Sequence, residues 1–380
     1  MEIKHYLLSI LYTLLFFSLG YVAYSQPTYN WDLLPYVGAT LSIDRSDKEY
    51  VHRRSYAEAE RVLPRQAFRA LTHPRSPFRS QVYQSPENFS QQLPIVRVKP
   101  LYIALIYTLQ ASGVNIVRAT VLVSVISGIF TALLVLVWLQ GYFSSTWGYL
   151  MAASLVFSAG MLTVSRLSTP DALSAALLLL GMFLLLEEKW LVWSGVVFIL
   201  SIYARLDNII IVSFVFTYLF LLAPREYRFN RARYMAFITA LIASYWLISH
   251  YAEAYSWDVL FTHAIERLLV NPKDAYVSLT REGYMAGLLA KSQWALLNPV
   301  VSLSIFVMLA SAAFSAIKMK FRNRNIYADI IIVTFAAIIV RYALFPLLNV
   351  RYYYGHSLVI GVCSLILLHM CFRESRKNSA

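Results

Sequence analysis

The segment Val114–Leu139 reads VNIVRATVLVSVISGIFTALLVLVWL and is long and apolar enough to cross the hydrocarbon core of a bilayer as a helix. Further runs that are long enough, or nearly so, are Tyr6–Val22, Leu150–Val164, Ala172–Leu186, Trp190–Tyr203, Ile209–Leu222, Met235–His250, Val300–Ile317, Ile330–Leu348 and Leu358–Phe372. Several are short, which leaves the number of spans open by about one or two. The sequence therefore predicts an all-α integral membrane protein with about ten transmembrane helices.

The amino-acid composition also indicates a membrane protein. The 380 residues are 59% hydrophobic and only 14% charged, and the mean hydropathy is +0.57. A water-soluble domain of this size is far less apolar. The net charge of +13 would suggest nucleic acid as a partner of a soluble protein, but here the basic residues fall in blocks between apolar runs. That placement indicates membrane topology and no nucleic-acid partner.

The basic blocks also predict an orientation. No small-residue cleavage site follows the first apolar run, Tyr6–Tyr24, which we interpret as a retained signal anchor and first span. Alternate connections carry Arg225, Arg228, Arg231 and Arg233, then Lys318, Lys320, Arg322 and Arg324, then Arg373, Arg376 and Lys377. The positive-inside rule then predicts cytoplasmic N- and C-termini, and two outer loops at 26–100 and 253–298. We treat residues 1–380 as a single module in a bacterial inner membrane.

The first outer loop is more than a linker. It opens with Trp31 and Asp32 among aromatic residues, and its middle, Ser55–Leu71, has an amphipathic helical pattern that suits helices lying in the headgroup plane. Prolines then interrupt regular structure at Pro74, Pro77, Pro86, Pro94 and Pro100. The chain contains no internal repeat, Gly-rich phosphate loop, zinc-ligand spacing or nucleophile elbow.

Polar residues cluster at the outer ends of the apolar runs. Ionisable groups there cost free energy unless they line a cavity or have partners, so they are the first candidates for function. The candidates are Asp32, Lys99, Arg118, Asp171, Arg205, Asp207, Arg351 and Tyr352. Arg351 is the only cation in a short outer loop, which favours a function over a simple interfacial anchor. Arg341, inside the preceding run, is expected to pair or snorkel.

The acidic candidates also have purely structural interpretations. Asp171 follows Ser-Thr-Pro and would suit the first turn of a helix, where an anion faces the positive end of the helix dipole. Asp207 could cap the next helix and pair with Arg205. Asp32 could cap a short helix over Leu33–Leu41, but it also lies where an outward-facing active site would need a base. Both interpretations stay open for each residue.

Short motifs in order along the chain resemble the C-type glycosyltransferase superfamily, membrane enzymes that use polyprenyl-phosphate sugars, such as protein O-mannosyltransferases and lipid A aminoarabinose transferases. The motifs are Trp31-Asp32-Leu-Leu-Pro-Tyr36, Lys99-Pro-Leu-Tyr102, Gly113 with Arg118, Arg166-Leu-Ser-Thr-Pro-Asp171-Ala-Leu-Ser, and Arg351-Tyr352. Each motif is only a few residues long. The resemblance depends on their joint order and sidedness over nearly the whole chain.

The resemblance implies a hexosyl- or pentosyltransferase that moves a sugar from a polyprenyl-phosphate donor to an envelope glycan, lipid or protein at the outer face, with inversion. In that mechanism Asp32 is the base on the acceptor hydroxyl. Arg351 binds the phosphate with a forked guanidinium, and Lys99 is a second cation. Asp171 and Arg205 shape the sugar pocket. The remaining substrate-binding candidates are Arg118, Asp207 and Tyr352.

Two departures leave part of this picture open. The family often has two adjacent acids in the first loop, whereas Asp32 stands alone and the next acid is Asp44. Lys99 replaces the first proline of a Pro-Pro pair. The use of a divalent cation and the class of acceptor are therefore not decided. Two alternatives from other classes are a transporter or flippase for a lipid-linked saccharide and a non-catalytic envelope assembly protein, which would tolerate loss of Asp32.

Overall fold

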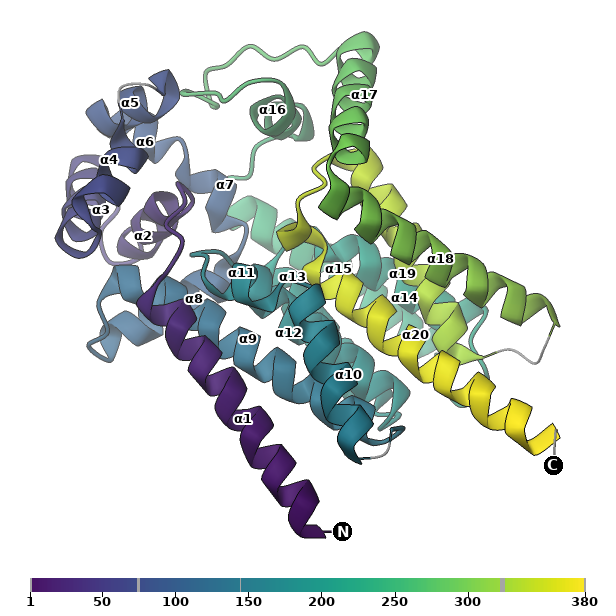
Figure 1. Ribbon diagram of the computed structural model, residues 1–380. Helices are drawn as coiled ribbons and strands as arrows, with labels where there is room; N and C mark the ends of the chain where they lie inside the picture. Colours follow the sequence, from purple (N-terminus) through teal and green to yellow (C-terminus); the bar gives the residue numbers. More distant parts are fainter. Residues whose placement is uncertain (1, 74–75, 144, 322–324, 379–380) are drawn as a thin grey trace.

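The structure, a computed structural model, describes residues 2–73, 76–143, 145–321 and 325–378. It is built from helices, and no strand occurs among these residues. The all-α class is therefore confirmed. Figure 1 shows a tilted bundle with both chain termini at one end and the helices of the two expected outer loops at the other. Arg322 and Arg324, two of the basic residues used for the topology prediction, lie outside the described residues.

Five described helices are long and apolar enough to span a membrane: His5–Ser25 within α1 (Glu2–Ser25), α9 (Ile116–Gln140), α15 (Arg231–Tyr251), α19 (Ile326–Leu344), and Val350–Arg373 within α20 (Val350–Asn378). Shorter apolar helices are α8 (Pro100–Ala111), α12 (Asp171–Leu186), α13 (Leu191–Ala204), α14 (Asn208–Leu221) and Ile305–Phe314 within α18 (Pro299–Phe321). At 1.5 Å per residue, the 14 residues of α13 measure about 21 Å, less than a bilayer core of about 30 Å. Ten full spans are therefore not confirmed.

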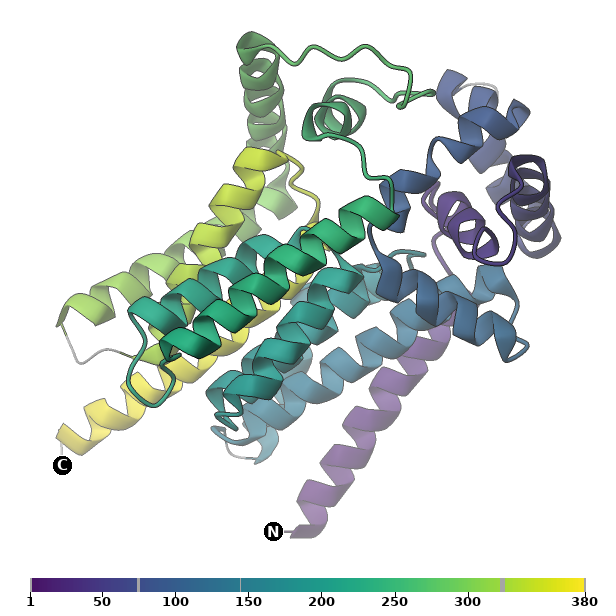
Figure 2. The ribbon, with the colours of Figure 1, turned by 180° about the vertical axis from the view of Figure 1, so that it is seen from behind.

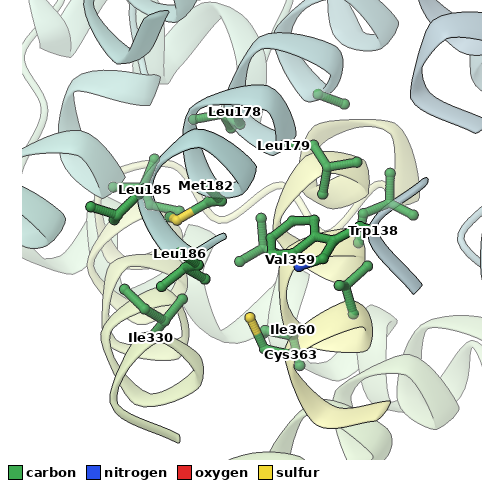
Figure 3. Close-up of a cluster of buried hydrophobic side chains, with 14 of the residues drawn as sticks. Trp138, Leu178, Leu179, Met182, Leu185, Leu186, Ile330, Val359, Ile360 and Cys363 are labelled. Carbon is green, nitrogen blue, oxygen red and sulfur yellow. The ribbon is translucent and has the colours of Figure 1, made fainter. Parts of the chain in front are cut away.

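The main core forms around α12, which packs against α9, α13 and α20. Figure 3 shows side chains of α9, α12 and α20, among them Trp138, Met182 and Val359, meeting in one buried cluster with Ile330 of α19. Ser194 of α13 donates a hydrogen bond to the carbonyl of Gly181 on α12 at 2.8 Å, and the Phe198 ring lies against the same glycine. Lipid tails are as apolar as these side chains, so close approach at small residues is what joins such helices.

Two further helices of the bundle are α10 (Ser145–Ser158) and α11 (Met161–Ser165). α10 packs on α1 and α9, and α11 packs on α9. A turn with Gly160 in the left-handed region, at φ +91°, joins the two helices. This turn lets the chain reverse before the Ser168–Asp171 segment.

The segment predicted as the first outer loop folds into six helices that share a hydrophobic core with α8 and the start of α9. They are α2 (Leu33–Leu41), α3 (Lys48–Val62), α4 (Arg65–Thr72), α5 (Pro77–Gln84), α6 (Pro86–Ser90) and α7 (Leu93–Arg97). The helix predicted over Ser55–Leu71 is divided between α3 and α4, because the chain is extended at Leu63 and Pro64. Ser76 and Ser85 cap α5 and α6 by accepting backbone N–H groups. Leu33, Val51 and Phe89 belong to the buried core of this segment.

The second outer loop packs on the first. It contains α16 (Trp257–Phe261), a turn of π-helix (Thr262–Glu266) and α17 (Arg281–Leu297). Gln91 of the first loop donates to Asp274 of the second at 2.8 Å, and Tyr255 donates to the Gln91 carbonyl at 2.8 Å. Figure 2 shows both segments together at the end of the bundle away from the termini. Residues far apart in the sequence therefore meet there.

Candidate functional site

A cavity of about 410 Å³ opens between the two outer loops and the ends of the bundle helices. Its charged lining residues are Arg79, Lys99, Arg205 and Arg351, with Asp32 and Asp171. Basic side chains thus exceed acidic ones by two. A partly enclosed site with this excess favours an anionic ligand.

Asp32 and Arg351 come together in this cavity from opposite ends of the chain. Nη1 of Arg351 donates to Oδ2 of Asp32 at 2.8 Å, and the Asn30 amide donates to the same oxygen at 2.8 Å. Nη2 of Arg351 donates to the Tyr352 hydroxyl at 2.7 Å. Nε of Arg351 lies 4.0 Å from Asp171 and has no hydrogen-bond partner among the described residues. One N–H of the guanidinium is therefore left without a hydrogen-bond acceptor in the described residues.

Behind this pair lies a second ion-pair network. Arg205 donates to both oxygens of Asp207, from Nε at 3.0 Å and from Nη2 at 2.8 Å, and it also contacts Asp171. Arg341 donates to Asp207 at 2.7 Å, as its predicted pairing requires. Burial alone would raise the pKa of Asp207, but the two guanidinium groups hold it well below its usual range. The network keeps Arg205 and Asp171 in fixed positions at the cavity wall.

The capping interpretations of these carboxylates are wrong for Asp32 and Asp207. Each stands at the N-cap position, of α2 and α14 respectively, but neither makes a side-chain capping bond. Both side chains are directed to guanidinium groups instead. Asp171 does lie in the first turn of α12, yet its oxygens bind Arg205 and the Thr169 hydroxyl. Ion pairing between helices, not helix capping, therefore determines how these three acids are oriented.

Lys99 lines the same cavity and lies next to Tyr36, with its Nζ 5.8 Å from the ring centroid. Its ammonium group donates to the Ile95 carbonyl at 2.9 Å. Burial, assisted by the nearby Arg205 charge, lowers the pKa of Lys99 to about 8. An arriving anion would offset both effects, so Lys99 is a cation that a phosphate would hold in its charged form.

Tyr352 also belongs to the site, whereas Arg118 does not lie there. The Tyr352 ring faces the Arg205 guanidinium, 5.0 Å from its centroid. Arg118 instead donates to the Tyr24 carbonyl at 3.1 Å and does not line the cavity. Asp207 contacts the site through Arg205 and is likewise not part of the lining. The structure thus brings Asp32, Lys99, Asp171, Arg205, Arg351 and Tyr352 together around one cavity.

Several lining residues are missing from the sequence prediction, among them Phe78, Gln92 and His263. The first two come from the first outer loop and the third from the second. Nδ1 of His263 accepts the Leu269 backbone N–H at 3.0 Å, and burial lowers the pKa of the ring. The hydrogen bond to Nδ1 and the lowered pKa together favour a neutral His263 imidazole with its hydrogen on Nε2. No local sequence signal marks these residues, because only the packing of the two loops brings them together.

No group of three or more His, Cys, Asp or Glu side chains with metal-binding spacing occurs within the described ranges. At the cavity, the two lining carboxylates are each engaged by arginine. A divalent cation would have to compete with those guanidinium groups for the same oxygens.

A second, apolar hollow adjoins the cavity. It has a volume of about 290 Å³ and is lined mainly by side chains of α17 to α20, including Met308, Ile338 and Leu348. The segment 347–353 borders both spaces, since Leu347 and Arg351 line the cavity while Leu348 and Tyr353 line the hollow. A charged site and an apolar groove are therefore separated by one short stretch of chain.

Comparison with known protein families, with characterised proteins and with solved structures finds no match to this chain.

Proposed function

We propose that this chain is a membrane glycosyltransferase that moves a sugar from a polyprenyl-phosphate donor to an envelope acceptor at the outer face of the membrane. The observation that carries the proposal is the 2.8 Å pair of Asp32 and Arg351 in a cavity with an excess of cations. Such a site offers a carboxylate that can act as a base and cations that can bind a phosphate.

A polyprenyl-phosphate donor would explain why the apolar hollow adjoins the charged cavity. An isoprenoid tail would lie in the apolar groove beside Leu348, and its phosphate would reach Arg351 across the segment that the two spaces share. Arg351, whose Nε makes no hydrogen bond in the described residues, and the ammonium of Lys99 are the cations that would bind that phosphate. The bilayer would present the lipid at this depth, which restricts diffusion to two dimensions.

The chemistry follows from the same residues. Asp32 takes the proton from the acceptor hydroxyl, the acceptor oxygen bonds to the anomeric carbon, and the bond from that carbon to the phosphate oxygen breaks. The electron pair leaves with the polyprenyl phosphate, whose developing charge Arg351 and Lys99 stabilise. In the structure Asp32 is paired with Arg351. A phosphate that attracts Arg351 would weaken that pair and free the carboxylate to act as a base.

A transporter for a lipid-linked saccharide requires polar groups along a path through the bundle. The charged residues of the candidate site instead lie around one cavity beside the two outer loops. This one-sided arrangement favours an enzyme over a transporter.

Analysis of envelope glycans in a strain that lacks the chain tests the proposal. The deletion should remove one sugar modification, and the wild-type chain should restore it. Arg351→Ala should fail to restore it, because it removes the phosphate ligand. Arg225→Ala, an exposed arginine far from the cavity, is the matched control and should restore it fully. Restoration by Arg351→Ala to the wild-type level would refute the proposed role of the cavity.

A further inference from the structure

Gln92 has no role in the chemistry proposed above, yet it is fully buried and lines the cavity. Its amide nitrogen donates to the carbonyls of Leu269 at 3.2 Å and Val270 at 2.8 Å. These two bonds use both amide hydrogens and fix which end of the amide is the oxygen. The oxygen, Oε1, has no hydrogen-bond partner among the described residues.

A buried acceptor without a donor is costly, and folded proteins rarely keep one without a reason. Trp31 also lines the cavity, and its buried indole Nε1–H, a donor, has no hydrogen-bond partner in the described part of the chain. The site therefore holds one unpaired acceptor and one unpaired donor, both neutral. Hydroxyl groups, which both donate and accept hydrogen bonds without carrying charge, are suited to satisfy both atoms.

Aromatic rings line the same cavity as Gln92. The Trp31 ring lies 4.9 Å from that of Phe78, edge to face, and the Phe78 ring lies 5.8 Å from that of His263. All three side chains line the cavity. Aromatic surfaces with a few fixed polar atoms are typical of sites for small organic ligands. A sugar ring matches this wall, because it has C–H groups on its faces and hydroxyl groups at its edge.

We infer that Gln92 and Trp31 form a subsite that recognises a hydroxyl-bearing sugar of the donor lipid, distinct from the cations that bind its phosphate. This inference depends on the proposed function and adds the specificity-determining residues to it. Gln92 accepts a hydrogen bond from one ring hydroxyl, and Trp31 donates one to a ring oxygen or hydroxyl. A site that pairs with a hydroxyl rejects analogues lacking it far more strongly than an apolar pocket does.

Measuring lipid binding to the full-length chain in nanodiscs distinguishes the sugar subsite from the cations that bind the phosphate. The probes are undecaprenyl phosphate and undecaprenyl phosphate carrying glucose, mannose or galactose. Wild-type protein should bind one sugar-bearing lipid more tightly than the bare lipid. Gln92→Met should weaken binding of that sugar-bearing lipid by about tenfold and leave binding of the bare lipid unchanged. Trp31→Phe should act in the same direction, and it breaks no bond within the protein.

Gln91→Met is the matched control. Gln91 also connects the two outer loops, through Asp274 and the Lys273 backbone, but it does not line the cavity. It should keep the preference for the sugar-bearing lipid, so loss of that preference in Gln92→Met cannot come from loosened loops alone.

The outcomes separate this inference from the proposed function. If Gln92→Met and Trp31→Phe both retain the wild-type preference, or if the wild type prefers none of the three sugars over the bare lipid, the subsite is refuted while phosphate binding stands. If the wild type binds undecaprenyl phosphate no better than Arg351→Ala does, the proposed function falls and this inference with it.

Discussion

Replacing Asp32 by Asn is the most informative single change. The substitution keeps the size of the side chain and an oxygen that can accept the hydrogen bond from Asn30, but it removes the negative charge and the base. Asp32 makes no capping bond to α2, so the helix loses no support from it. If Asp32 is the base, folding should be nearly normal and sugar transfer should collapse.

The expected losses of stability and of transfer rate in Asp32→Asn can be compared. The Asp32 and Arg351 side chains are 35% and 18% exposed, so their ion pair is partly screened by solvent. Such a pair contributes about 1 kcal/mol or less to stability. Loss of a general base costs about a hundredfold to ten-thousandfold in rate, which corresponds to roughly 3–5 kcal/mol in the activation barrier. The loss of rate should therefore greatly exceed any loss of stability.

Transfer of radiolabelled sugar from the donor lipid in membranes measures the rate, and thermal unfolding in detergent measures stability. Asp44→Asn is the matched control, because Asp44 belongs to the same loop and binds Tyr107 outside the cavity. A rate for Asp32→Asn within about tenfold of the wild-type rate would contradict the base assignment. Asp171 would then be the next residue to test.

Three further predictions use other parts of the structure. The value of kcat/KM for the donor should fall as the pH rises through about 8, because Lys99 loses its charge there, and Lys99→Arg should abolish that fall; an unchanged pH profile would exclude Lys99. Arg205→Leu leaves buried Asp171 without its hydrogen-bonded guanidinium partner and Asp207 with Arg341 alone, and it should lower stability by about 3 kcal/mol in thermal unfolding. Arg54→Leu is the control, because that arginine is 52% exposed and its partner Glu58 keeps Arg61, and it should cost about 1 kcal/mol or less. Reporters fused at Arg65 and at Arg228 should lie on opposite sides of the membrane, and the same side for both would overturn the topology.

Parts of the site could be predicted from the sequence because charged residues beside membrane-spanning segments cost free energy and therefore indicate candidate functional positions. Asp32, Lys99 and Arg351 were candidates since ionisable groups beside apolar runs need a reason to be there. The structure brings all three to one cavity. Arg118 met the same criterion and lies elsewhere, bound to the Tyr24 carbonyl. Position along the chain indicates depth in the membrane, but it does not indicate which side of a helix a residue occupies.

The orientation of the Asp32 and Asp207 side chains could not be predicted from local sequence patterns. Asp32 and Asp207 occupy N-cap positions, and local sequence alone favours a cap there. The arginines that engage them, Arg351, Arg205 and Arg341, come mostly from other helices, and a charge-assisted bond to a guanidinium is stronger than a bond to a backbone N–H. Tertiary contacts therefore override the local preference.

The helical membrane class and the helical character of the first outer loop can be predicted from the sequence alone, because hydropathy and helical periodicity act over neighbouring residues. Even the break between α3 and α4 has a local cause in Pro64. Only the tertiary structure decided that Gln92 and His263 line the cavity, since the two outer loops that carry them meet through contacts about 180 residues apart in sequence. Such pairings depend on the shape of the packed chain, and no short stretch of sequence records that shape.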